Sequence, residues 1–338
     1  MCSVRPIRIW LYALSCLVIF NGCSAQNGQK QYVVSSDVLM GTFVQIKAYS
    51  SHHSRPDLKK ITDKAFEKAS LLEAKFDIFD PDSEISLVNV SGGKRVSKEL
   101  IDVLEKASRI GEVTDGSFDV TVSPVLKENG FYGDMPGELL SRIPDSKNGI
   151  GRENVMIDVE TGTVLLKNNA WIDLSGIAKG YIVDSMAGIL LEEGVERFLV
   201  DAGGDMYCHS SGGNDAWVIG VRDPKRKNVA LRINIGSQAV ATSGDYENIV
   251  QEADDKVLAH IVKPDTESVI DREFYSVTVI SSTCAEADAL ATGMVAMGTD
   301  KAVELADRLN GTEIIILEEK DGVRNMELSA DAGMFIEG

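Results

Sequence analysis

Apolar and polar residues alternate over residues 31–50, in the stretch QYVVSSDVLMGTFVQIKAYS. A period of two predicts β-strands, and Gly41 near the middle predicts the turn of a hairpin. Over residues 58–72 the apolar positions instead recur at the spacing of one helix face, which predicts an amphipathic helix. Ser97 then precedes a second series with helical spacing and is expected to cap a second helix.

Loops are expected between these elements. The stretch FDIFDPDSEIS, residues 76–86, is acidic and contains a proline, which favours a loop. In DGSFDVTVSP, residues 115–124, turn residues lead to a short β-branched run. Residues 131–160 are rich in Gly, Pro, Asp and Asn, and are predicted to form a long loop with at most short elements.

The second half of the chain mixes strand-like and helical patterns. A helix with Ile182, Met186 and Leu190 on its inner face is expected to end at Gly194. Strands are expected at residues 163–166, 197–208 with a break at 203–204, 216–222, 229–235, 239–244, 276–282 and 312–319, and helices at 285–297 and 300–309. Because strands and helices do not alternate strictly, the sequence predicts an α+β fold.

The first residues have the pattern of an export signal. A short basic segment is followed by an apolar run over residues 9–20, which is too short to span a membrane, and then by Gly22 and Cys23. We expect a lipoprotein-type signal peptide at 1–22, lipid on Cys23, a linker over 23–31 and one domain over 32–338. The alternative is a signal peptide cut nearby, with Cys23 an ordinary cysteine. The protein is therefore expected outside the cytoplasm, lipid-anchored on the periplasmic or cell-surface side.

The net charge of −18 opposes binding to nucleic acid and docking on anionic lipid. Any phosphate ligand therefore has to be held locally, by backbone amides, single lysines or a metal ion. Cys208 and Cys284 remain after the signal peptide, and two buried thiols are favoured over a disulfide.

Two short stretches could bind a charged ligand. In EADALATG, Asp288 and Thr292 are four residues apart on a predicted helix, so a carboxylate and a hydroxyl could reach one hard cation. In DLSGIAKG, Gly176 lets the backbone of a strand-to-helix turn approach a phosphate, and Lys179 adds a positive charge. Taken singly, each has an ordinary structural explanation: a helix-end acid, a self-bonded threonine or a generic glycine turn. His260 alone is likewise more typical of a structural histidine than of a base.

Eight motifs in order resemble the ApbE family, the FAD:protein FMN transferases. They are MGT at residues 40–42, PDSEIS at 81–86, DGSFDVTV at 115–122, DLSGIAKGYIVD at 173–184, VDAGGD at 200–205, ATSGDYE at 241–247, HIVKP at 260–264 and EADALATG at 286–293. The resemblance runs from about residue 33 to the end of the chain. It implies an ApbE-like flavin transferase fold, an α+β body with a duplicated core.

The resemblance also implies the site residues. FAD would be contacted by Met40, Phe79, Ser117, Phe118, Asp119, Asp173, Lys179 and Val262. Mg²⁺ would be held by Asp288, Thr292 and the carbonyls of Gly176 and Ala291, and His260 would be the base. Asp173 suits an N–H donor of adenine or isoalloxazine better than a phosphate, because two anions repel each other.

The implied activity is Mg²⁺-dependent transfer of FMN from FAD to a threonine of an acceptor protein, such as a membrane redox-complex subunit, with release of AMP. The alternative is an FAD-binding lipoprotein that stores FAD or only hydrolyses it to FMN and AMP. Three positions depart from the family pattern: Lys263 stands where members commonly have Asp, Glu267 where they have Gly, and Phe131-Tyr132-Gly133 where they have Trp-Gly-Phe. None of these departures affects the proposed metal ligands.

Overall fold

The computed structural model describes residues 31–337, apart from 213–214, 227, 246–248, 252–256, 272–274 and 321–322. The predicted signal peptide at 1–22 and the predicted lipid site Cys23 lie outside these residues. Gln31, the last residue of the predicted linker over 23–31, pairs with Ser50 in a strand, and the rest of that linker lies outside the described residues. No helix in the described part of the chain is both long enough and apolar enough to cross a membrane.

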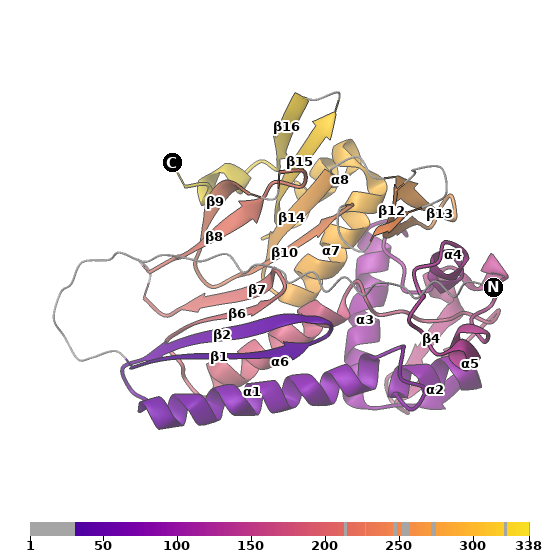
Figure 1. Ribbon diagram of the computed structural model, residues 1–338, viewed down its shortest axis with the longest axis horizontal. Coiled ribbons are helices and arrows are strands. Elements are labelled where there is room, and N and C mark those ends of the chain that lie inside the picture. The colour runs from indigo at the N-terminus through magenta and orange to yellow at the C-terminus, as the bar shows by residue number, and fades with distance from the viewer. Residues whose placement is uncertain are drawn as a thin grey trace, which may run out of the picture.

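An eight-stranded sheet forms the centre of the molecule, and its neighbouring strands all run antiparallel (Figure 1). The strand order is β1 (Gln31–Leu39), β2 (Thr42–Ser50), β6 (Arg197–Ala202), β7 (Asp205–Ser210), β10 (Ala239–Gly244), β14 (Tyr275–Ser281), β15 (Glu313–Lys320) and β16 (Val323–Leu328). Because successive side chains point to opposite faces, each strand can supply two cores. Val200 packs into the core on one face and Leu199 into the core on the other.

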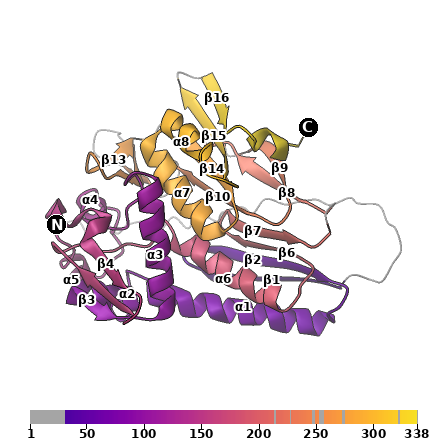
Figure 2. The same cartoon turned by 180° about the vertical axis from the view of Figure 1, so that it is seen from behind.

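Helices cover one face of this sheet (Figure 2). They are α1 (Arg55–Phe76), α6 (Ala178–Glu192) and α7 (Cys284–Met297), with α8 (Thr299–Ala306) beside α7. Part of the other face is covered by the two-stranded sheet of β8 (Trp217–Arg222) and β9 (Val229–Ile235), which encloses the smaller apolar core.

The remaining elements surround one end of the main sheet. β3 (Gly93–Arg95), β5 (Thr163–Leu166) and β4 (Val155–Asp158) form one small sheet, and β11 (Ile249–Gln251), β12 (Val257–Lys263) and β13 (Ser268–Asp271) form another. The shorter helices are α2 (Glu84–Ser91), α3 (Lys98–Val113), α4 (Ser123–Glu128) and α5 (Gly137–Leu140), with 3₁₀ turns at Lys147–Gly149, Arg152–Asn154 and Ala332–Phe335.

The predicted α+β class is confirmed, as are the hairpin over 31–50 and the capped helix after Ser97. The hairpin turn is Met40-Gly41, and both residues have positive φ, 54° and 68°. The Ser97 hydroxyl accepts a hydrogen bond from the backbone N–H of Leu100, which begins α3. The duplication of the core implied by the resemblance stays a prediction.

The loop prediction for 76–86 is wrong at its end. The segment after Pro81 turns into α2, because the Ser83 hydroxyl accepts the Ser86 N–H at 3.1 Å and caps a helix. The turn residues of 115–124 do form turns, and the chain then enters α4 with Pro124 in its first turn. Six strands, β3, β4, β11, β12, β13 and β16, were also not predicted as separate elements. Four of them, β3, β4, β11 and β13, have only three or four residues, too few to show a clear alternation of apolar and polar positions.

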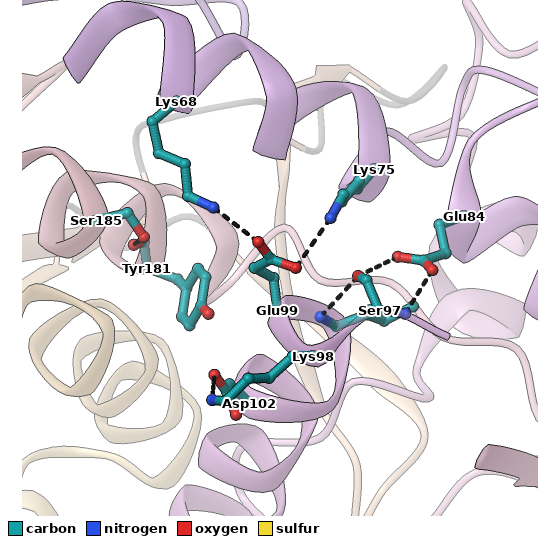
Figure 3. A network of polar contacts seen from close by, with 10 residues as sticks. Lys68, Lys75, Glu84, Ser97, Lys98, Glu99, Asp102, Tyr181 and Ser185 are labelled. Carbon is teal, nitrogen blue, oxygen red and sulfur yellow. Dashed lines mark hydrogen bonds and ion pairs between the residues drawn. The ribbon is translucent and has the colours of Figure 1, made fainter. Parts of the chain in front are cut away.

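A polar cluster joins α1 to α3 (Figure 3). The Glu99 carboxylate lies between two lysines of α1, with Lys68 Nζ at 2.7 Å and Lys75 Nζ at 2.9 Å. These hydrogen bonds lower the pKa of Glu99 to about 2. The two helices are therefore joined by salt bridges that require an ionised Glu99.

Cys208 and Cys284 are both buried and neither is in a disulfide, so the interpretation as buried thiols is confirmed.

Candidate functional site

A cavity of about 690 Å³ opens at one end of the main sheet. Its walls come from the hairpin turn, the end of α1, the segment after α3, the region of α4, the N-terminal part of α6, the end of β10, β12 and α7. Figure 1 shows the hairpin turn, α4 and β12 toward the same side of the molecule. Segments from residue 40 to residue 292 thus contribute to one enclosed volume.

Nearly all the residues predicted to contact FAD or the metal line this cavity. They are Met40, Phe79, Ser117, Phe118, Asp119, Asp173, Gly176, Lys179, His260, Val262, Asp288 and Thr292. Ala291 does not line the cavity and is fully buried in α7. Its carbonyl as a metal ligand therefore stays a prediction that rests on the resemblance.

The floor of the cavity carries an unusual concentration of buried acid. The Asp288 carboxylate is almost completely buried and accepts a hydrogen bond from the Gly180 N–H at 3.0 Å. Burial and the nearby charge of Asp205 raise the pKa of Asp288 to about 7. Asp205, itself buried, forms an ion pair with Lys179 of α6. Lys179 balances one of these two carboxylates, and a cation bound beside Asp288 would balance the other.

The side chains beside Asp288 suit a hard cation. The Thr292 hydroxyl lies 3.1 Å from the Ser243 hydroxyl of β10. A Cβ placed on Gly176 would lie 3.5 Å from the Thr292 hydroxyl, so the Gly176 backbone passes close to this oxygen. A carboxylate, hydroxyls and backbone carbonyls are the oxygen donors that Mg²⁺ prefers. No cluster of three or more His, Cys, Asp or Glu side chains suited to a metal occurs among the described residues, and the expected set needs only the one carboxylate.

Asp173 is held rigidly on another wall. One carboxylate oxygen accepts the Ser175 N–H at 2.8 Å, and the other accepts the Tyr132 hydroxyl at 2.6 Å. The Tyr132 ring meets the Phe79 ring edge to face, with centroids 6.1 Å apart. Phe79 is the more exposed of the two rings, so this wall runs from a buried carboxylate to an aromatic rim.

The hairpin turn forms another part of the cavity lining. Met40 adopts the left-handed conformation, and its N–H donates to the Glu73 carboxylate of α1. Since few non-glycine residues adopt positive φ, this bond helps to hold Met40 against the cavity.

His260 lies on β12, half-buried in the cavity wall. The other candidate base, Asp245, is buried outside the lining, and its carboxylate accepts the Tyr275 N–H at 2.9 Å. The geometry therefore favours His260 over Asp245 as the group that meets a substrate.

Four residues of this site were not assigned roles from the sequence: Glu73, Tyr132, Asp205 and Ser243. Asp205 and Ser243 belong to the motifs VDAGGD and ATSGDYE, whose glycines and hydroxyls were each also compatible with plain turns. Glu73 lies in a helix predicted only from its apolar face, and Tyr132 lies in a segment interpreted as loop.

One departure from the family pattern has a visible structural consequence. Glu267 adopts φ 49°, in the left-handed region where glycine is favoured. The chain keeps the turn conformation here and accepts the strain of a side chain.

The ApbE family model matches residues 40–316, which is most of the chain. The chain belongs to the ApbE family. It is 30% identical over 335 residues to the FAD:protein FMN transferase of Vibrio cholerae, covering 96% of this chain and 98% of that one.

Solved structures of the family share the fold. The ApbE protein of Thermotoga maritima superposes with a TM-score of 0.79 at 31% identity, covering 91% of this chain and all of that one. The flavin transferase ApbE of Vibrio cholerae gives a TM-score of 0.73 at 27% identity, over 90% and 99% of the two chains. This ApbE-family chain therefore has the family's fold over nearly its whole described length.

Proposed function

We propose that this ApbE-family protein is an FAD:protein FMN transferase that moves FMN from FAD to a threonine of an acceptor protein and releases AMP. The observation that carries the proposal is the cavity that gathers Asp173 and Lys179 of one motif with His260 and Asp288 from two other segments. A cavity of about 690 Å³ is within the range that holds cofactor-sized ligands. The relatives named FAD:protein FMN transferase support the same activity.

The chain's own residues account for the chemistry. The threonine oxygen would form a bond to the FMN-side phosphorus of FAD, while the bond from that phosphorus to the AMP oxygen breaks. His260 would accept the proton of the threonine hydroxyl, since a neutral imidazole can act as a base near neutral pH. Lys179 would place a positive charge beside the pyrophosphate, where negative charge shifts to the leaving AMP. Asp173 would orient FAD through one of its N–H groups.

We propose Mg²⁺ as the cation of the acidic floor, held by Asp288, Thr292 and the carbonyls of Gly176 and Ala291. When bound, this ion would neutralise charge on the pyrophosphate of FAD. Two features of the structure support the fit: the buried excess of carboxylates, and the close approach of Gly176 to the Thr292 hydroxyl.

The second candidate is a lipoprotein that stores FAD or only cleaves it to FMN and AMP. The position of His260 in the cavity wall favours the transferase, because storage of FAD needs no base. Mass spectrometry of a co-expressed candidate acceptor distinguishes transfer of FMN from storage or hydrolysis of FAD. The acceptor is incubated with the protein, FAD and Mg²⁺ before the measurement. A mass gain equal to FMN on an acceptor threonine is expected. Release of FMN and AMP with no mass gain on any acceptor would refute the transfer.

We further propose that the protein is exported and anchored to a membrane through lipid on Cys23, which would place it beside membrane-bound acceptors. The support is the order of basic segment, apolar run and Gly22-Cys23 at the start of the chain. Cys23→Ser should move the protein from the membrane fraction to the soluble exported fraction. Unchanged fractionation would contradict the anchor.

A further inference from the structure

Tyr132 is one of the most deeply buried polar side chains of the cavity wall, with 4% of its surface exposed. Its hydroxyl donates to one oxygen of Asp173 at 2.6 Å. Burial and the negative charge of Asp173 raise the pKa of Tyr132 well above its usual value. The phenol therefore stays protonated at every ordinary pH and acts as a permanent donor to this carboxylate.

The backbone around Asp173 is fixed independently of Tyr132. The N–H and carbonyl of the preceding residue, Ile172, are both bonded to the Asn89 side chain at 2.8 Å. The Asp173 N–H donates to the Val120 carbonyl at 2.7 Å. What the backbone leaves free is rotation of the carboxylate plane, because this terminal torsion has a broad energy profile.

Two donors stop that rotation. The Ser175 N–H holds one oxygen and the Tyr132 hydroxyl holds the other, so the plane of the carboxylate is set. Each oxygen keeps a second lone pair, and Asp173 lines the cavity. A ligand that presents an N–H group at the right place meets an acceptor that already has its orientation, which reduces the entropy lost on binding.

We infer that Tyr132 is a positioning residue that orients the Asp173 carboxylate and thereby makes the site selective for a flavin dinucleotide with a free ring or amino N–H group. The inference rests on the proposed function, in which FAD occupies this cavity. It also gives a role to one of the three residues that replace the Trp-Gly-Phe of other members, since the phenol that reaches Asp173 comes from that segment.

The test compares binding of three ligands by calorimetry: FAD, FAD methylated at N3 of the isoalloxazine and FAD dimethylated at N6 of adenine, so that each modified form lacks one of the two possible donors. The wild-type protein should bind one of the two methylated forms at least about tenfold more weakly than FAD, as expected for a hydrogen bond to a charged group. In Tyr132→Phe, this ratio should fall to within about threefold, and FAD itself should bind about tenfold more weakly.

A matched control is Tyr275→Phe, which removes a tyrosine hydroxyl outside the cavity lining. Within the described part of the chain, this hydroxyl accepts a hydrogen bond from the Thr299 hydroxyl at 3.4 Å. It should keep both the affinity and the ratio. A double-mutant cycle adds a second readout: once Asp173→Ala is present, Tyr132→Phe should weaken FAD binding by no more than about twofold, because a positioning residue acts through its partner.

The outcomes separate the inference from the function. If Tyr132→Phe keeps the wild-type ratio, or weakens all three ligands equally, Tyr132 has only a structural role. If wild-type protein binds FAD but does not discriminate against either methylated form, the selectivity claim is wrong while the proposed function stands. If wild-type protein does not bind FAD at all, both the selectivity inference and the proposed function are wrong.

Discussion

Gly180 marks the closest approach of α6 and α7, and its replacement by alanine tests how the cation-binding floor is held in place. A Cβ at this position would lie 2.3 Å from the Cys284 carbonyl oxygen, 2.6 Å from its carbon and 2.8 Å from the Ala285 Cα. All three atoms are backbone, so no side chain can move aside. Ordinary contact begins near 3.4 Å, so the start of α7 has to move by about 1 Å.

This displacement would act on the site through the hydrogen bonds that two residues of α6 make with α7. The Gly180 N–H donates to the Asp288 carboxylate at 3.0 Å. Asp184, one turn further along α6, accepts the N–H groups of Cys284 and Ala285 at 2.7 and 2.9 Å. Both contacts fix α7 on α6 over the turn that carries Asp288.

We expect Gly180→Ala to lower the free energy of unfolding by about 1–3 kcal/mol, as overpacking does in a dense core. Misplacement of reacting groups by about 1 Å can slow a reaction on the order of 10²-fold, so FMN transfer should fall by a comparable factor. Urea unfolding followed by circular dichroism gives the first quantity. The rate of FMN transfer to an acceptor at saturating FAD and Mg²⁺ gives the second.

Gly188→Ala is the matched control on the same helix. Nothing lies within 4 Å of a Cβ at Gly188, so alanine should raise the free energy of unfolding by about 0.5–1 kcal/mol through helix propensity alone. Activity should not change. If Gly180→Ala is as stable and as active as Gly188→Ala, the argument that the α6–α7 approach positions Asp288 is wrong.

Three further predictions concern single charged groups. Glu99→Gln should lower the free energy of unfolding at neutral pH by at most about 3 kcal/mol, because the pKa of Glu99 is lowered from 4.5 to about 2. Solvent screening of this partly exposed ion pair makes the actual loss smaller. A carboxylate whose pKa is lower in the folded state stabilises the fold at pH values above its unfolded pKa, and this stabilisation is lost on acidification. The difference in free energy of unfolding between wild type and Glu99→Gln, measured by urea titration, should therefore shrink below about pH 4.5 and vanish near pH 2. A difference that stays constant with pH would contradict the ion-pair origin. His260→Ala should keep FAD affinity within a few-fold in calorimetry and slow FMN transfer at least ~100-fold; an equal loss of both would make His260 a ligand contact. Asp288→Ala should abolish transfer and remove any Mg²⁺ dependence of residual activity. Asp288→Asn keeps an acceptor for the Gly180 N–H and should retain the fold. If either variant shows the Mg²⁺ dependence of wild type, Asp288 is not a metal ligand and acts only as an acidic residue near the start of its helix.

Local patterns in the sequence determined the elements that carry most of the site. The alternation over 31–50 fixed a hairpin, and Gly41 marked its turn, because strand period and turn chemistry are local properties. Ser97 predicted the start of α3 for the same reason, because its side chain caps the helix that follows it. The wrong loop prediction at the end of 76–86 also has a local origin. Ser83 caps α2, but Pro81 and the acids around it dominated the interpretation of that segment.

The sequence likewise named most of the cavity lining, but only as a set of motifs in order. Asp173 and Lys179 belong to one motif, whereas His260 and Asp288 lie far from it along the chain. All four share a cavity because antiparallel strands end beside two packed helices. Which motif meets which, and at what distance, depends on that packing.

Only the tertiary structure decided the contacts that tune the site. Tyr132 reaches Asp173 across 41 residues, and Gly180 reaches Asp288 across 108. The raised pKa of Asp288 comes from burial and from Asp205, and neither is visible in the sequence around residue 288. Such effects depend on distance and desolvation in space, so a one-dimensional pattern holds the residue types but not the electrostatics that their packing creates.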